Sequence, residues 1–230
     1  MNFSSAVISE NKRGFIAVIP DIKCVSPKTG DLLKGRNPVE TAKELVGYCG
    51  APVLSVVTES EKFGGSKQLL IDIARSTVVP VLRKDFITNL DQISETADLG
   101  AAAVLLICAV TDEKNLCMLY EKSIKAGLEP FVEAHNAEEL KLAKKLGAKL
   151  IGINNRNIVT LELDDGGPSR TAALASGIGS DVVLVSESGI VSPDDAKTAA
   201  AAGANAVLVG TALWQAQNMG EMYKSLRIRI

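Results

Sequence analysis

The chain has 230 residues, of which 47% are hydrophobic, 23% charged and 4% aromatic, with a formal net charge of −2 and a pI of about 5.6. This length fits one large α/β domain, and the balanced charge excludes the strongly basic surface of a nucleic-acid-binding protein. The longest apolar run (101–110) is too short to cross a bilayer, and residues 1–13 lack the pattern of a signal peptide, so we expect a cytoplasmic protein without a membrane partner.

Four glycines mark a repeat along the chain. Gly50, Gly100, Gly147 and Gly203 each follow a helix-like stretch and precede a short apolar run. This pattern predicts a helix that ends on a left-handed glycine and leads into a buried strand. The glycines are 50, 47 and 56 residues apart (100−50, 147−100 and 203−147). One strand and helix need roughly half of that, because a βαβ crossover takes about 30 residues. Another strand is therefore expected between successive glycines.

Taken in chain order, four further apolar runs supply those strands: Phe15–Ile19, Val78–Leu82, Pro130–Glu133 and Val182–Ser186. Helix starts follow at Asn37, Asn136 and Ser192, each a capping residue with an acid three positions later. Interleaving the two sets gives eight strands that alternate with helices. The pattern favours a single (β/α)8 TIM barrel over residues 1–230, with a short N-terminal segment before strand one. An open doubly wound sheet is the alternative.

Cysteine and histidine are too sparse for a metal site. The four cysteines (Cys24, Cys49, Cys108 and Cys117) form no CxxC pair, and His135 is the only histidine. Zinc sites of the Cys/His type need about four such ligands. A disulfide framework is not expected in a cytoplasmic chain of this size. We therefore predict no metal and no cofactor, and we place the cysteines in the core or at its boundary.

Polar residues gather after the predicted strands, where the reactive groups of a parallel barrel lie. In chain order these residues are Asp21, Lys23, Ser26, Thr58, Glu59, Arg83, Lys84, Asp85, Glu133, His135, Asn154, Asn155, Arg156, Ser186, Glu187, Ser188, Gly189, Gly210 and Thr211. The strand beginnings carry almost no charge. Some of these side chains could be merely solvated strand ends, but the convergence of acids and lysines from several strands indicates a site.

Two short pairs point to phosphate. Ser188-Gly189 and Gly210-Thr211 follow the seventh and eighth predicted strands. Glycine lets backbone N–H groups approach an anion, and the loops after these two strands commonly bind phosphate in such barrels. We predict that Gly189, Gly210 and Thr211 bind the phosphate of a small-molecule substrate.

From about Phe15 to Trp214 the chain resembles the indole-3-glycerol phosphate synthase family. The most specific matching runs are Leu82–Phe86 and Ile151–Arg156. The other matching stretches are Lys23 with Ser26-Pro27, Ser55–Glu59, Phe63–Ser66, Val132–His135, Ser186–Ile190 and Val209–Leu213. The resemblance implies a carboxy-lyase of tryptophan biosynthesis. Such an enzyme closes the indole ring of 1-(2-carboxyphenylamino)-1-deoxyribulose 5-phosphate and releases carbon dioxide and water.

The resemblance also implies roles for individual residues. Lys84 matches the general acid that protonates the substrate ketone, and Glu133 matches the base that assists dehydration. Lys23 would meet the substrate carboxylate or phosphate, and Arg156 would add a cation near the phosphate. Asn154, Glu187, Ser26 and Ser188 match polar groups that hold and orient the substrate, and Pro27, Phe63, Phe86 and Leu105 match its apolar wall.

Two residues beside these positions are given no catalytic role. His135 comes two residues after Glu133, and we expect the strand to turn it away from the barrel interior, as a structural residue. Cys24 follows Lys23 and is expected to point the opposite way. We expect a monomer or weak homo-oligomer, with room for a partner from the tryptophan pathway.

Asp21 is also a candidate catalytic residue, but it keeps other functions open, because the family carries glutamate at this position. The side chain is shorter by one carbon–carbon bond, about 1.5 Å. One alternative is a paralogous barrel lyase that acts on another aryl or sugar phosphate. Another is a non-catalytic partner subunit, which the retention of both Lys84 and Glu133 disfavours. A phosphoribosylanthranilate isomerase is disfavoured because its Cys/Asp pair has no counterpart that we can place.

Overall fold

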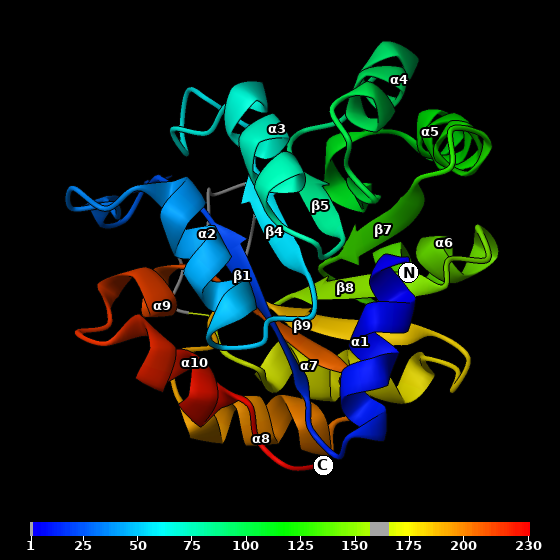
Figure 1. The fold of residues 1–230 in the computed structure, drawn as a ribbon. Helices are drawn as coiled ribbons and strands as arrows, with labels where there is room; N and C mark the ends of the chain where they lie inside the picture. Colours follow the sequence, from blue (N-terminus) through cyan, green and yellow to red (C-terminus); the bar gives the residue numbers. More distant parts are fainter. Residues whose placement is uncertain (1, 157–165) are drawn as a thin grey trace.

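The computed structural model describes residues 2–156 and 166–230, in which eight parallel strands close into a barrel (Figure 1). In chain order the strands are β1 (Ala17–Ile22), β4 (Leu54–Val57), β5 (Val81–Lys84), β6 (Ala103–Ile107), β7 (Glu129–Ala134), β8 (Leu150–Asn154), β9 (Val183–Glu187) and β10 (Ala206–Val209). β1 pairs with β4 on one side and with β10 on the other, which closes the sheet. The prediction of a TIM barrel is confirmed, and the open sheet is excluded.

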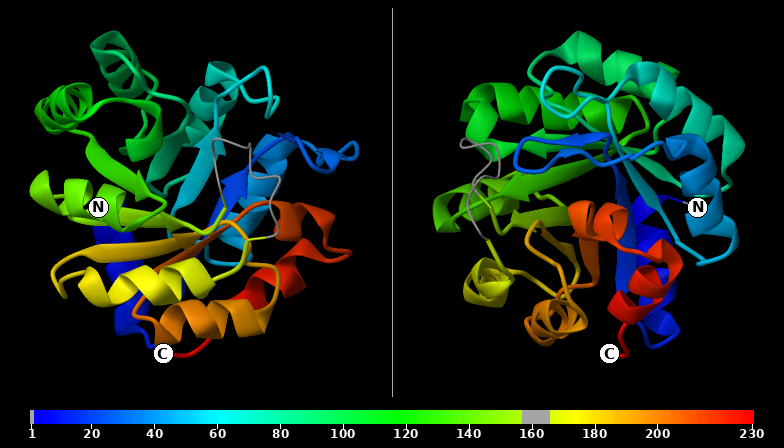
Figure 2. Two further views of the ribbon diagram at one scale, coloured as in Figure 1. Left: turned by 180° about the vertical axis from the view of Figure 1, so that it is seen from behind. Right: turned by 90° about the vertical axis from the view of Figure 1, so that its left-hand side faces the viewer.

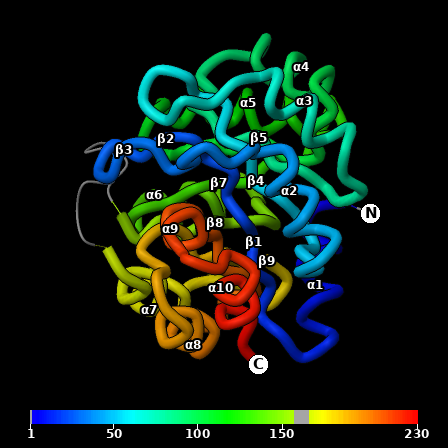
Figure 3. Tube along the Cα trace, turned by 60° about the vertical axis from the view of Figure 1, so that its left-hand side comes forward, coloured from blue at the N-terminus to red at the C-terminus, as the bar shows by residue number. Residues whose placement is uncertain are grey.

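Helices surround the barrel on its outside, except the first one, which covers the N-terminal end of the barrel (Figure 2). In chain order they are α1 (Phe3–Lys12), α2 (Pro38–Gly47), α3 (Lys67–Ser76), α4 (Leu90–Asp98), α5 (Glu113–Lys125), α6 (Ala137–Lys145), α7 (Ser169–Leu174), α8 (Pro193–Ala201), α9 (Thr211–Gln215) and α10 (Met219–Leu226). Asn37, Asn136 and Ser192 cap α2, α6 and α8 as predicted. Near the C-terminus, α10 lies beside α8 and α9 (Figure 3). No helix in the described ranges is long and apolar enough to cross a membrane.

The four repeat glycines have the left-handed backbone that the pattern predicts. Their φ angles are +75° at Gly50, +86° at Gly100, +73° at Gly147 and +97° at Gly203. A residue with a Cβ adopts such angles only at a cost, so glycine ends each helix and turns the chain into the next strand.

The core has an inner and an outer layer. Inside the barrel, strand residues such as Leu105, Phe131 and Leu208 pack together with Phe3 and Val7 of α1. The same cluster contains Ala17 and Val183, the first residues of β1 and β9, so α1 covers the N-terminal end of the barrel. The opposite end, where the strands finish, stays available for a site. Outside the barrel, larger apolar clusters join the strands to the surrounding helices.

Three predicted strands are shifted toward the C-terminus in the structure. Phe15 forms an isolated bridge with Arg229 instead of beginning β1. Val78 is 96% exposed, and β5 begins only at Val81. β9 extends to Glu187, whose side chain is buried despite its charge. The segment before β1 is the helix α1, which the sequence analysis left without an assigned structure. A short hairpin of β2 (Val25–Ser26) and β3 (Gly30–Asp31) also follows β1 and was not predicted.

Candidate active site

The ammonium group of Lys84 lies between two buried carboxylates at the C-terminal end of the barrel. Lys84 Nζ is 3.8 Å from Glu133 Oε2 and 3.7 Å from Glu187 Oε2. Lys84 ends β5, while Glu133 and Glu187 come from β7 and β9, and both carboxylate side chains are fully buried. The predicted acid and the predicted base therefore meet in space, although 49 positions separate them (133−84).

The surroundings of Glu133 favour its charged form. Burial alone would raise the pKa of this carboxyl, but the positive charges of Lys84 and His135 and the amide of Asn154 outweigh burial and lower it. Glu133 is thus a carboxylate at neutral pH and can accept a proton. The ammonium of Lys84, 3.8 Å away, stabilises this negative charge.

Asn154 lies at the end of β8, between the strands that carry the two carboxylates. It pairs with Glu187 in the strand register, is fully buried, and accepts a hydrogen bond at Oδ1 from the backbone N–H of Arg156 at 3.0 Å. This hydrogen bond fixes the amide and starts the turn that brings Arg156 to the barrel mouth.

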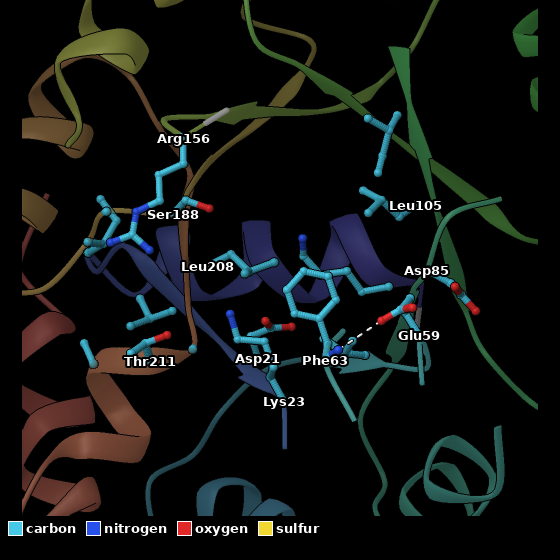
Figure 4. Close-up of a pocket in the computed structure, with 18 of the residues that line it drawn as sticks. Asp21, Lys23, Glu59, Phe63, Asp85, Leu105, Arg156, Ser188, Leu208 and Thr211 are labelled. Carbon is cyan, nitrogen blue, oxygen red and sulfur yellow. Dashed lines mark hydrogen bonds between the residues drawn. The ribbon is translucent and has the colours of Figure 1, made fainter. Parts of the chain in front are cut away.

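A cavity of about 720 Å³, counting the space that opens to solvent, lies over these groups (Figure 4). Lys84, Phe63, Phe86 and Leu105 line one part of it, and Arg156, Ser188, Gly189, Gly210 and Thr211 line another. Figure 4 shows Arg156, Ser188 and Thr211 at one end and Phe63, Leu105 and Asp85 at the other. The cavity therefore offers polar and cationic groups at one end, and apolar side chains beside the acids Glu59 and Asp85 at the opposite end.

Close backbone contacts shape the polar end. Gly189 has a φ of +69°, and a Cβ there would lie 2.6 Å from the carbonyl oxygen of Gly166. A Cβ on Gly166 would in turn lie 2.4 Å from Cγ of Arg156. Two glycines thus let the loop after β8 pack against the loop after β9. This packing keeps the Arg156 side chain beside Ser188.

Asp21 and Lys23 extend from the end of β1 into the cavity lining. Asp21 Oδ1 accepts a hydrogen bond of 2.7 Å from Ser55 Oγ, and a Cβ on Gly210 would come within 3.2 Å of Asp21 Oδ2. Lys23 is 6% exposed, and its Nζ lies 5.5 Å from the ring centroid of Phe63. The short Asp21 side chain is therefore held against β4 and β10, whereas Lys23 lies beside the apolar wall.

The structure leaves five predicted site residues outside the cavity lining. Three of them, Glu133, Asn154 and Glu187, are fully buried, and the other two lie at the β2–β3 hairpin. Ser26 is buried and Pro27 is exposed, both at the β2–β3 hairpin, and neither belongs to the cavity lining. Cys24 also stays out of the lining and packs against the outer core cluster, as expected.

The expectation that His135 turns away from the site is wrong. Its Nε2 lies 3.2 Å from Glu133 Oε1, and its Nδ1 lies 3.0 Å from Glu139 Oε2. The reason is that residues two apart along a strand share a face, so the alternation that turns Glu133 inward also directs His135 to the side of Glu133. The imidazole ring therefore faces the carboxylate of Glu133, the predicted base.

Two residues that support the site had no predicted role. The side-chain amide of Asn155 donates to Ser186 Oγ and to the carbonyl oxygens of Glu187 and Ser188, which fixes the end of β9. Arg83, which is 1% exposed, forms ion pairs of 3.0 Å with Asp85 and with Glu95. Both residues lie within the runs that match the family. Each is next in sequence to a residue with a predicted direct role, Asn155 to Asn154 and Arg83 to Lys84. Because neighbouring side chains along a strand point to opposite faces, strand alternation was the signal that these two residues support the site from outside.

Comparisons with known proteins identify the family of the chain. The family model described as indole-3-glycerol phosphate synthase matches residues 1–226. The indole-3-glycerol phosphate synthase of Pyrococcus furiosus is 44% identical over 207 residues, which cover 90% of each chain. The enzyme of the same name from Streptococcus sanguinis is 41% identical over 213 residues, 93% of this chain and 82% of its own. A solved structure of thiamine phosphate pyrophosphorylase from Pyrococcus furiosus has a TM-score of 0.66 at 15% identity and covers 95% of each chain, which shows a shared fold. The chain belongs to the indole-3-glycerol phosphate synthase family.

Proposed function

We propose that the chain is a carboxy-lyase of tryptophan biosynthesis that converts 1-(2-carboxyphenylamino)-1-deoxyribulose 5-phosphate to indole-3-glycerol phosphate. Relatives that are 44% and 41% identical over most of the chain carry the name of this enzyme. The observation that carries the proposal is the placement of the Lys84 ammonium between two buried carboxylates beside a cavity with a cationic end and an end that carries apolar side chains.

The substrate fits the cavity in one direction. Its phosphate would lie at the polar end, near Arg156, Ser188, Gly189, Gly210 and Thr211. Its aromatic ring would lie against Phe63, Phe86 and Leu105, with the ring carboxylate near Lys23. This orientation places the substrate ketone, which lies between the ring and the phosphate, near the middle of the cavity and Lys84.

The two proton-transfer groups then have separate tasks. As the aromatic carbon attacks the ketone, Lys84 gives a proton to the ketone oxygen. The bond to the carboxylate breaks, carbon dioxide leaves, and its electron pair restores the aromatic ring. The oxygen is now a hydroxyl and needs a second proton to leave as water. Glu133 takes the proton that the neighbouring carbon releases as the indole forms and passes it to the departing hydroxyl, and solvent restores the proton that Lys84 gave. Asn154 and Glu187 keep the charged side chains of Glu133 and Lys84 in position.

Turnover of the candidate substrate tests the proposal. Purified protein should produce indole fluorescence and release carbon dioxide. Lys84→Ala and Glu133→Gln should each lower kcat by about 100-fold or more, because each removes a proton-transfer group. Lys197→Ala, which removes an exposed lysine on α8, should not. Folded wild-type protein that binds inorganic phosphate but forms no indole would reject the proposal.

A paralogous lyase remains the second candidate because of Asp21. Ser55 holds this carboxylate at 2.7 Å, and the side chain is about 1.5 Å shorter than the glutamate of the family. If the chain is an indole-3-glycerol phosphate synthase that works with aspartate at position 21, the wild type should turn over the candidate substrate. If it acts on another aryl or sugar phosphate, wild-type turnover should be absent and Asp21→Glu should not restore it.

We further propose that the chain acts in the cytoplasm, as a monomer or a weak homo-oligomer. All four cysteines carry free thiols, as in proteins of a reducing compartment. Gel filtration with light scattering over a range of protein concentrations tests the oligomeric state.

A further inference from the structure

His135 is enclosed by two carboxylates from different elements. On one side its Nε2 lies 3.2 Å from Oε1 of Glu133 in β7, and on the other its Nδ1 lies 3.0 Å from Oε2 of Glu139 in α6. The His135 side chain is 9% exposed. The three side chains therefore form a row that leads from the first turn of α6 to the centre of the site.

The start of α6 fixes the outer end of this row. Asn136 Nδ2 donates to Glu139 Oε1 at 2.7 Å, and the backbone N–H of Glu139 donates to Asn136 Oδ1 at 3.0 Å. The backbone N–H of His135 donates to Glu139 Oε2 at 2.8 Å. One carboxylate oxygen of Glu139 thus contacts Asn136, and the other contacts His135. This arrangement leaves the imidazole little freedom to rotate.

The two carboxylates determine the charge of the imidazole. Burial alone would lower the pKa of His135, but Glu133 and Glu139 outweigh burial and raise it from 6.5 to about 9. The other polar groups that face this row are Lys84, Glu187, Asn154 and Cys108, of which only Lys84 is a further cation. His135 is therefore an imidazolium at neutral pH.

The two oxygens of Glu133 face different cations. Oε2 lies 3.8 Å from Lys84 Nζ, whereas Oε1 lies 3.2 Å from His135 Nε2. In the proposed reaction Lys84 gives its proton to the ketone oxygen and becomes neutral. From that moment His135 is the cation left beside Glu133.

We propose that His135 is a positioning residue that keeps Glu133 ionised and correctly oriented for the dehydration step, after Lys84 has lost its charge. The inference rests on the proposed function, because it states which cation stabilises Glu133 at each stage of the reaction: Lys84 and His135 before the ketone is protonated, and His135 afterwards. His135 itself transfers no proton to the substrate and does not line the cavity.

A direct test of the charge is independent of turnover. His135 is the only histidine of the chain, so its ring protons give an unambiguous NMR signal in protein without a tag. We expect this signal to titrate at about pH 9 in the wild type. Glu133→Gln and Glu139→Gln should each move the titration to lower pH. A midpoint at or below the ordinary value of about 6.5 in the wild type would overturn the proposal.

The kinetic test uses His135→Gln, which keeps a hydrogen-bonding side chain but removes the charge. We expect kcat near neutral pH to fall about 10- to 100-fold while KM changes less than about twofold. The acid limb of the kcat profile, where Glu133 takes up a proton, should move to higher pH. Glu139→Gln should not move it to higher pH, because His135 is still an imidazolium at the acid limb without Glu139.

The matched control is Asp195→Asn in α8. Asp195 stands at the same position of its helix as Glu139. It accepts a hydrogen bond from the backbone N–H of Val191, as Glu139 does from that of His135, and a second one from the backbone N–H of Ser192. Its loss weakens a helix cap without touching Glu133, so the acid limb should stay where it is. An acid limb that stays unmoved in His135→Gln, or that moves equally in Asp195→Asn, would reject the positioning role. Absence of wild-type turnover would reject the proposed function, while the NMR titration would still decide the charge of His135.

Discussion

The carboxylate of Glu187 occupies the space that a side chain at Gly152 would need. A Cβ built on Gly152 would lie 2.0 Å from Glu187 Oε1 and 2.6 Å from a ring carbon of Phe131. Gly152 lies in β8, whose neighbours β7 and β9 carry Glu133 and Glu187. The absence of a side chain in the middle strand therefore lets an acid from β9 lie inside the barrel, within reach of Lys84.

Gly152→Ala should separate Glu187 from Lys84. We expect kcat to fall at least about tenfold, and the free energy of unfolding to fall by about 1–3 kcal/mol because the methyl group overpacks the interior. Urea denaturation and steady-state kinetics measure the two effects. Gly47→Ala is the control, since a Cβ at this position in α2 meets nothing within 4 Å. If Gly152→Ala keeps full activity, Glu187 does not need its present position.

Arg83 and the exposed Lys67 both pair with Glu95, and Arg83 should contribute more to the free energy of unfolding. Its guanidinium is buried between Asp85 and Glu95, and it also donates to Thr58 and Thr96. Arg83→Met leaves these groups without their cation and should cost about 3–5 kcal/mol.

The matched comparison is Lys67→Ala. Lys67 also pairs with Glu95, but its side chain is 54% exposed. Such surface pairs contribute about 0–1 kcal/mol. Chemical denaturation of both variants measures the difference, and equal losses would contradict the assigned role of Arg83.

The stability that His135 provides should depend on pH in a defined direction. Its folded pKa of about 9 lies above the ordinary value of 6.5. A raised pKa means that the stabilisation is complete below about pH 6.5 and is lost as the pH rises through about 9. We expect His135→Gln to cost about 1–3 kcal/mol near pH 6 and less near pH 10. Urea denaturation at several pH values checks this, and a cost that grows with pH would contradict it.

Cys108 should be the least reactive of the four thiols. Its side chain is buried, and burial, together with the nearby carboxylates of Glu139 and Glu133, raises its pKa to about 12. Only the thiolate reacts readily, so iodoacetamide at mildly alkaline pH should modify Cys108 slowly in the native protein. Cys117, half-buried on α5, is the internal comparison. Peptide mass spectrometry measures both rates, and equal rates would contradict the prediction.

The sequence was sufficient to predict the barrel because its signals are local and repeated. Gly50, Gly100, Gly147 and Gly203 each need a left-handed backbone, which hardly any other residue adopts. Once parallel strands are established, their C-terminal ends must share one face. The meeting of Lys84 with Glu133 therefore followed from topology alone.

What the sequence could not reveal depends on contacts between strands and on the backbone beyond strand ends. The side of His135 could have been predicted, because it is two residues from Glu133 and shares its face, but its second contact with Glu139 depends on where α6 begins. Pro27 lies at an unpredicted hairpin that leaves it exposed. The spatial role of Gly152 depends on the register of β8 against its neighbours, which no local pattern encodes.

Closure of the barrel through β1 and β10 sets an order of assembly while the chain is being made. β1 pairs with β10 from Ala17 with Ala206 to Pro20 with Val209, so one edge of the first strand has no neighbour until the last strand leaves the ribosome. Unpaired strand edges attract other chains. Gly210 and Thr211 follow β10 directly, so the polar end of the cavity is also completed last. A chain that ends before β10 would expose an open sheet edge and lack part of the polar end of the cavity.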